Sequence, residues 1–97
     1  MAARTSAYGC KALTNLDEEA ASIAAEDPAA ARRVVRRIMA AVAELTDRPG
    51  IGRPGRVPGA RELVAARTRY VIPYRVRGGV VEILRVFHMS RHLPGGW

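Results

Sequence analysis

His88 is the side chain in this sequence best suited to proton transfer near neutral pH, because imidazole changes charge in that range. Acid–base catalysis of phosphate transfer needs a group that takes a proton, an acid for the leaving oxygen, and cations that hold the phosphate. His88 is therefore the candidate catalytic residue. A capping or packing role at the end of a strand is the alternative for the same residue.

Arginines supply the cations that such chemistry would need. Arg53 and Arg56 lie in a glycine- and proline-rich stretch, where small neighbours let a nucleic-acid backbone approach closely. Arg61 opens a predicted strand, and Arg91 follows His88 by three residues. We expect these four arginines to bind RNA or phosphate, with simple solvation as the alternative for Arg91. Arg85 also precedes His88 by three residues, and this odd spacing predicts that the two point to opposite faces of a regular strand.

The charge is concentrated in the C-terminal half of the chain. Sixteen basic residues, of which Lys11 is the only lysine, oppose nine acidic ones and give a net charge of +7. Residues 1–47 carry six basic and seven acidic residues, a net −1, whereas residues 48–97 carry ten arginines against Glu62 and Glu82, a net +8. This asymmetry indicates a polyanionic or acidic partner. We expect the arginines of the second half to surround a common hollow.

Length and composition restrict the class of protein. A chain of 97 residues that is 48% apolar and 26% charged is typical of one globular domain, here residues 1–97. Cys10 is the lone cysteine, so neither an intrachain disulfide nor a cysteine-based metal site is possible, and we expect no cofactor and no metal. The absence of a long apolar run predicts a cytoplasmic protein without a membrane segment.

Two helices are predicted before the sheet. Apolar residues three and four positions apart predict a helix over Ala12–Glu26, and Asp27-Pro28 then forms an N-cap and first helical position for a second helix that ends before Pro49. The two helices form a tight hairpin. Arg32, Arg33, Arg36 and Arg37 lie on the polar side of the second helix, where they face solvent or a partner protein.

The remainder of the chain is typical of β-structure. After a loop over Pro49–Gly59, strands are predicted over Arg61–Ala65, Tyr70–Val76 and Val80–His88, the last two joined by Gly78-Gly79. Pro73 cannot donate to a ladder, so we expect a bulge or an edge position there. Tyr70 and Tyr74 share one face of their strand, either as core residues or as a surface that stacks bases. The segment Met1–Tyr8 is a poor strand sequence, and weak pairing there would leave a sheet edge open to a partner strand.

These elements predict an α+β fold, in which an N-terminal helical hairpin packs on a small antiparallel sheet. Their order, spacing and residues resemble the RelE/ParE superfamily of bacterial type II toxins over nearly the whole chain. The resemblance is carried by Leu13–Leu16, Asp27–Arg32, Pro49–Arg53, Arg61–Leu63, Tyr70–Val76 and Val81–His88.

The resemblance implies a toxin that arrests growth when free and that is sequestered in a complex with a cognate antitoxin. One branch of the superfamily cleaves mRNA in the ribosomal A site, and another inhibits DNA gyrase without being a nuclease. The net charge of +8 on residues 48–97 suits ribosomal RNA, so the sequence favours a ribosome-dependent endoribonuclease. Gyrase inhibition, or a decayed toxin that acts only as a binding module, are the alternatives.

One departure from the first branch is visible. Relatives with the best-defined acid–base pair carry a glutamate in the loop before the sheet and a tyrosine after the histidine. This chain has Gly55-Arg56 and Met89 there, so catalysis would depend on His88.

Overall fold

The helical hairpin forms where the sequence predicts it. The computed structural model describes residue 3 and residues 5–90, with helix α1 over Cys10–Ala24 and helix α2 over Pro28–Asp47. The carboxylate of Asp27 accepts a hydrogen bond from the Ala30 amide at 3.1 Å, and Pro28 occupies the first turn of α2. The cap and the proline thus fix the start of α2, while α1 begins and ends two residues earlier than the apolar spacing predicts.

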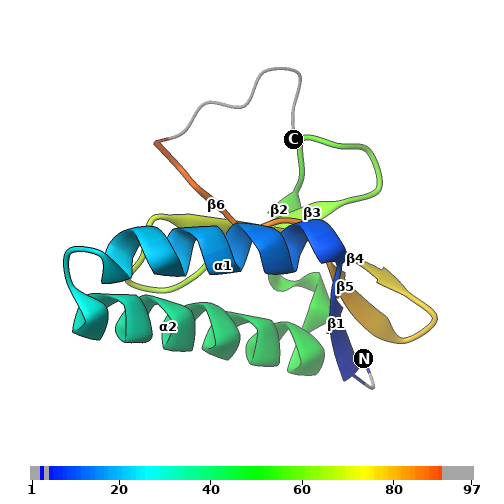
Figure 1. Cartoon of the computed structure of the whole chain (residues 1–97). Coiled ribbons are helices and arrows are strands. Elements are labelled where there is room, and N and C mark those ends of the chain that lie inside the picture. Colours follow the sequence, from blue (N-terminus) through cyan, green and yellow to red (C-terminus); the bar gives the residue numbers. More distant parts are fainter. Residues whose placement is uncertain (1–2, 4, 91–97) are drawn as a thin grey trace.

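Six strands form one sheet beside the hairpin (Figure 1). Their bounds are β1 Thr5–Tyr8, β2 Arg53–Pro54, β3 Arg61–Val64, β4 Tyr70–Arg77, β5 Val80–Ile83 and β6 Phe87–His88, and a short 3-10 turn, η1, covers Pro49–Ile51. The order across the sheet is β1-β5-β4-β3-β2, and β6 also pairs with β4. The α+β prediction is confirmed, and the sheet is antiparallel except where β1 runs parallel to β5.

The N-terminal segment is a strand despite its weak sequence. Thr5 pairs with Val80 and Tyr8 with Ile83, and the Gly9 amide donates to the Ile83 carbonyl at 2.9 Å. Strand pairing uses backbone groups, so low side-chain propensity does not prevent it here, where the Ala3 amide also donates to the Thr46 carbonyl of α2 at 2.8 Å. The described part of this segment therefore covers the β5 edge that the sequence left open, and Met1, Ala2 and Arg4 lie outside the described residues.

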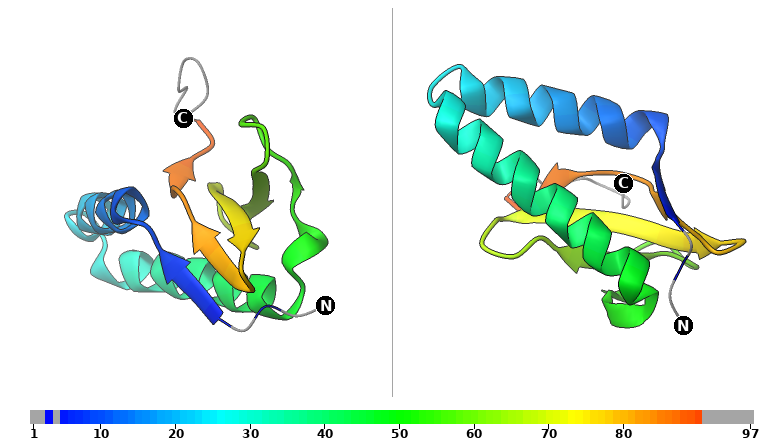
Figure 2. Two further views of the ribbon diagram at one scale, coloured as in Figure 1. Left: turned by 90° about the vertical axis from the view of Figure 1, so that its right-hand side faces the viewer. Right: turned by 90° about the horizontal axis from the view of Figure 1, so that it is seen from below.

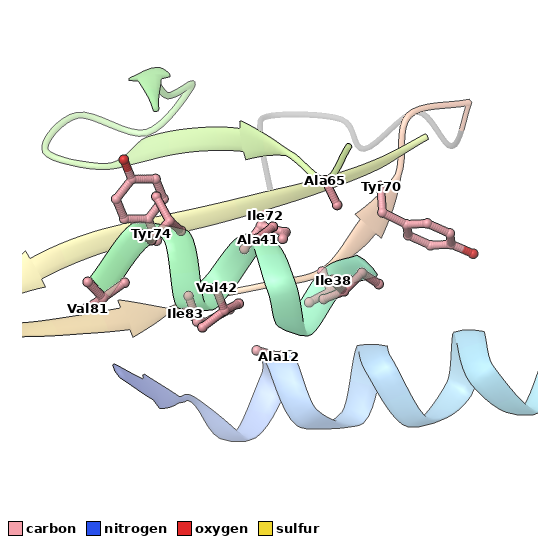
Figure 3. Packing of buried hydrophobic residues seen from close by; sticks show 12 residues of the cluster. Ala12, Ile38, Ala41, Val42, Ala65, Tyr70, Ile72, Tyr74, Val81 and Ile83 are labelled. Carbon is pink, nitrogen blue, oxygen red and sulfur yellow. The ribbon is translucent and has the colours of Figure 1, made fainter. Parts of the chain in front are cut away.

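The core lies between the hairpin and one face of the sheet. In the right-hand view of Figure 2, α2 crosses the long strand β4 diagonally. Ile38 and Val42 of α2 pack in one cluster with residues of β4 and β5 (Figure 3), and Leu45 belongs to the same cluster. Tyr70 and Tyr74 belong to this cluster and are buried, which confirms the core interpretation of the two tyrosines.

A bulge interrupts the last predicted strand opposite Pro73. Five positions separate Arg75 from Tyr70 on β4, whereas six separate their partners Glu82 and His88. The expected continuous strand Val80–His88 is therefore wrong: β5 ends at Ile83, and β6 resumes at Phe87 with the pairing shifted by one residue. The Pro73 carbonyl accepts a hydrogen bond from the Leu84 amide at 2.9 Å. Proline has no N–H group that could donate a hydrogen bond back to the neighbouring strand, and this explains why the ladder breaks here.

Within the described residues, no helix is long and apolar enough to cross a membrane.

Candidate functional site

The turn that leads into Arg53 is held against the sheet by Tyr74. The Tyr74 hydroxyl donates to the Pro49 carbonyl at 2.6 Å and accepts from the Gly52 amide at 2.9 Å. A Cβ at position 52 would lie 2.5 Å from the Tyr74 oxygen and 2.9 Å from the Glu62 carbonyl oxygen, so only glycine fits. Burial raises the pKa of Tyr74, against smaller lowering effects of the Gly52 amide and the Arg61 charge.

The face of the sheet opposite the helices carries most of the charged side chains of the strands. Directly paired residues of neighbouring strands point to the same face, and alternate residues of one strand share it. We call this surface the helix-free face. The register places on it Arg53, Glu62, Val71, Pro73, Arg75, Arg77, Glu82 and Phe87.

Glu62 joins the two loop arginines on this face. Its side chain is only 2% exposed, and its carboxylate lies 3.5 Å from the Arg53 guanidinium and 3.7 Å from that of Arg56. It also accepts from the Arg56 backbone amide at 3.2 Å. The Arg56 guanidinium lies 5.5 Å from the centre of the Phe87 ring, within the range of a cation–π contact. Arg53, Glu62 and Arg56 form the first triad, with a net charge of +1.

Arg75, Glu82 and Arg77 form a second triad of the same composition. Glu82 lies 2.7 Å from the Arg75 guanidinium and 3.8 Å from that of Arg77. Arg75 and Arg77 line a hollow of about 340 Å³ whose other walls come from Leu84, Val76 and loop residues 57–60, directly after Arg56. Two of the C-terminal arginines therefore border a hollow, and two more lie on the same face.

His88 lies on the other side of the sheet. It pairs with Tyr70, and the two rings meet edge to face with their centres 5.1 Å apart. The Tyr70 hydroxyl donates to the carboxylate of Glu19 in α1 at 2.8 Å. The His88 Nδ1 accepts from the Ser90 amide at 3.1 Å and lies 2.6 Å from the Ser90 hydroxyl. The imidazole is thus placed with the helices, on the face opposite the first triad.

The remaining candidate arginines are placed elsewhere. Arg61 pairs with Tyr74, which faces the helices, and its guanidinium donates to the Gly52 carbonyl at 2.8 Å. Arg85 lies in the bulge, where regular alternation does not apply, and it lines a hollow beside α1 with Lys11 and Glu18. Arg91 lies outside the described residues. Of the predicted phosphate-binding residues, the structure brings Arg53 and Arg56 together, and it does not bring His88 to them.

Two acidic residues of the site were not predicted. Glu62 and Glu82 are the only acidic residues of the chain's second half, and each lies at the centre of a triad. Their rarity in a strongly basic segment is the signal that points to them. The described residues contain no group of three histidine, cysteine or acidic side chains that would hold a metal ion.

Comparison with known proteins identifies the family. The model of the ParE toxin of the type II toxin–antitoxin system parDE matches residues 10–93. This chain belongs to the ParE toxin family. A curated relative named "Putative toxin Y4kP", from Sinorhizobium fredii, is 50% identical over 84 residues, which cover 87% of this chain and 86% of the relative. The expected membership of the RelE/ParE superfamily is confirmed.

Two solved structures share the fold. A chain of the chromosomal ParDE toxin–antitoxin system from P. aeruginosa has a TM-score of 0.79 and 30% identity, covering 89% of this chain and 95% of that one. A chain of the RelBE2 toxin–antitoxin complex from Mycobacterium tuberculosis has a TM-score of 0.60 and 24% identity, covering 94% and 95%, and this likeness concerns the fold alone.

Proposed function

We propose that this ParE-family toxin is held by a cognate antitoxin and that the free toxin inhibits DNA gyrase without cleaving RNA. This differs from the mRNA cleavage that the sequence favours. The observation that carries the proposal is the separation of His88 from Arg53 and Arg56, which lie on opposite faces of the sheet.

The separation matters because of what cleavage requires. A proton acceptor and the cations that stabilise the developing charge must reach the same phosphate. The His88 ring contacts Tyr70 and Ser90, whereas the first triad lies beside Phe87. Arginine stays protonated near neutral pH, so the arginines of the triads can hold charge but cannot replace an acid–base group. The carboxylates of Glu62 and Glu82 are each engaged by two of these arginines.

The comparisons support the same choice. The family model that matches is that of ParE, and the ParDE chain is more similar to this one than the RelBE2 chain in both fold and sequence. Both solved structures come from toxin–antitoxin systems, which supports an antitoxin as the partner of this chain. The net charge of +7 suits an acidic antitoxin.

The test is induction of the chain in cells without its antitoxin. We expect growth arrest with an SOS response and DNA breaks trapped on gyrase, and no codon-phased cuts in cellular mRNA by primer extension. His88→Ala should retain the toxicity, provided that circular dichroism shows the variant folded. Codon-phased cuts that disappear in the folded His88→Ala variant would instead establish mRNA cleavage, and normal growth would indicate a decayed toxin.

A further inference from the structure

The helix-free face presents cations in an unusual arrangement. Each glutamate is shared by two arginines, so each triad is fixed in place yet keeps a charge of +1. Arg53 and Arg56 remain 62% and 45% exposed although they contact the buried Glu62. A carboxylate that orients guanidinium groups and leaves them open to solvent lowers the entropy cost of binding an anion.

The two triads are neighbours. Glu62 pairs with Pro73 on β4, and Arg75 is the next residue of β4 on the same face. Diagonal neighbours of this kind lie about 7–8 Å apart. The hollow lined by Arg75 and Arg77 lies between β4 and the loop that begins at Arg56. The four guanidinium groups therefore lie on the same face of the sheet, in two neighbouring pairs.

We propose that the two triads together bind the phosphate backbone of duplex DNA. Arginine forms paired hydrogen bonds with phosphate oxygens, and contacts of this kind position a protein on DNA without reading its sequence. Glu62 acts as a positioning residue, because it orients Arg53 and Arg56 and contacts no DNA itself.

Other anionic ligands fit the face less well. The core of a protein interface is apolar, but Val71, Pro73 and Phe87 of this face are buried, and among the strand residues of the face Val64 is the exposed large apolar side chain. Single-stranded nucleic acid is bound by stacking its bases on aromatic rings. Tyr70 and Tyr74 lie in the core cluster (Figure 3), and Phe87 is buried as well. The phosphate backbone of duplex DNA can bind without an apolar interface core and without exposed aromatic rings.

The experiment measures binding of the purified full chain to a short fluorescein-labelled duplex by anisotropy, as a function of salt. Four phosphate contacts give a slope of log K against log salt of about −3.6, and the Arg53→Gln/Arg56→Gln variant should bring it to about −1.8. The matched control Arg33→Gln/Arg36→Gln removes the same charge from α2, on the other side of the sheet, and should leave the slope near the wild-type value.

Glu62→Gln separates positioning from charge. The substitution makes the protein more basic, which alone would strengthen DNA binding, whereas loss of arginine orientation weakens it. We expect weaker binding and a shallower slope in the folded variant. Tighter binding would refute the positioning role of Glu62.

Three results would overturn the binding surface itself: equal slopes for the two arginine variants, tighter binding of a single-stranded RNA of the same sequence, or displacement of the duplex by a polyglutamate peptide of equal charge. DNA binding by this face would extend the proposed function, since gyrase acts on DNA. It is tested without gyrase, so either proposal can fail while the other stands.

Discussion

Replacing Tyr74 by Phe should destabilise the protein more than the loss of one oxygen atom suggests. Tyr74 is fully buried, and its hydroxyl serves both the Gly52 amide and the Pro49 carbonyl. The Gly52 amide would lose its partner in a buried position, at about 1–3 kcal/mol, and the half-exposed Pro49 carbonyl about 1 kcal/mol more. The expected loss in the free energy of unfolding is therefore about 2–4 kcal/mol, a large part of the ~5–15 kcal/mol of a typical domain.

Urea unfolding followed by circular dichroism measures this loss. The matched control is Tyr8→Phe, which removes a hydroxyl from the half-buried residue at the end of the edge strand β1 and should cost under about 1 kcal/mol. The melting temperature of Tyr74→Phe should fall by roughly 10–30 °C. If Tyr74→Phe unfolds at the same urea concentration as Tyr8→Phe, Tyr74 does not anchor the loop, and the positioning of Arg53 and Arg56 needs another explanation.

Three further predictions concern stability. Gly52→Ala should lower the free energy of unfolding, measured with urea, by about 3 kcal/mol or more. Adding Tyr74→Phe should restore little of this stability, because the new Cβ would still lie 2.9 Å from the Glu62 carbonyl oxygen. Full recovery in the double variant would contradict this prediction. Burial raises the pKa of Tyr8 and Tyr74 above 10.0, so the folded state holds these protons more tightly than the unfolded state. The free energy of unfolding should therefore keep its full value below pH 10 and fall above it, less steeply in Tyr74→Phe. A melting temperature that stays level as the pH rises above 10 would argue against the raised pKa values. Asp27→Ala should cost about 1 kcal/mol by removing the α2 cap, and an unchanged melting temperature would show that Pro28 alone fixes the helix start.

The parts of the fold that the sequence predicts are those with local causes. Asp27 and Pro28 start α2 through their own side chains. Gly78 and Gly79 have φ of +59° and +76°, the conformation that a two-residue hairpin turn requires and glycine adopts without strain. The alternation of Tyr70, Ile72 and Tyr74 likewise predicts their shared buried face.

The candidate site depended on register, which is not local. In an unbroken strand from Val80, His88 would share the face of Glu82 and so lie with the arginines. The one extra residue opposite Pro73 moves His88 to the helix side instead. Pro73 indicated a bulge, but the sequence did not say on which strand it would fall or how it would turn the histidine.

Burial of Glu62 and pairing of β1 also depend on distant contacts. Glu62 accepts a hydrogen bond from the Arg56 amide in the loop after β2, and Tyr74 of β4 holds the turn just before β2 through the Gly52 amide. Thr5–Tyr8 forms a strand because β5, more than seventy residues later in the chain, offers its edge. Neither contact leaves a pattern in the neighbouring residues.

Gyrase inhibition is tested most directly by a supercoiling reaction with purified gyrase, relaxed plasmid, ATP and the purified chain. We expect the wild type and His88→Ala both to stop supercoiling, cleaved plasmid to accumulate, and equimolar antitoxin to restore the reaction. Full supercoiling in the presence of excess folded toxin, with cellular mRNA cut at codon boundaries on induction, would contradict the proposal.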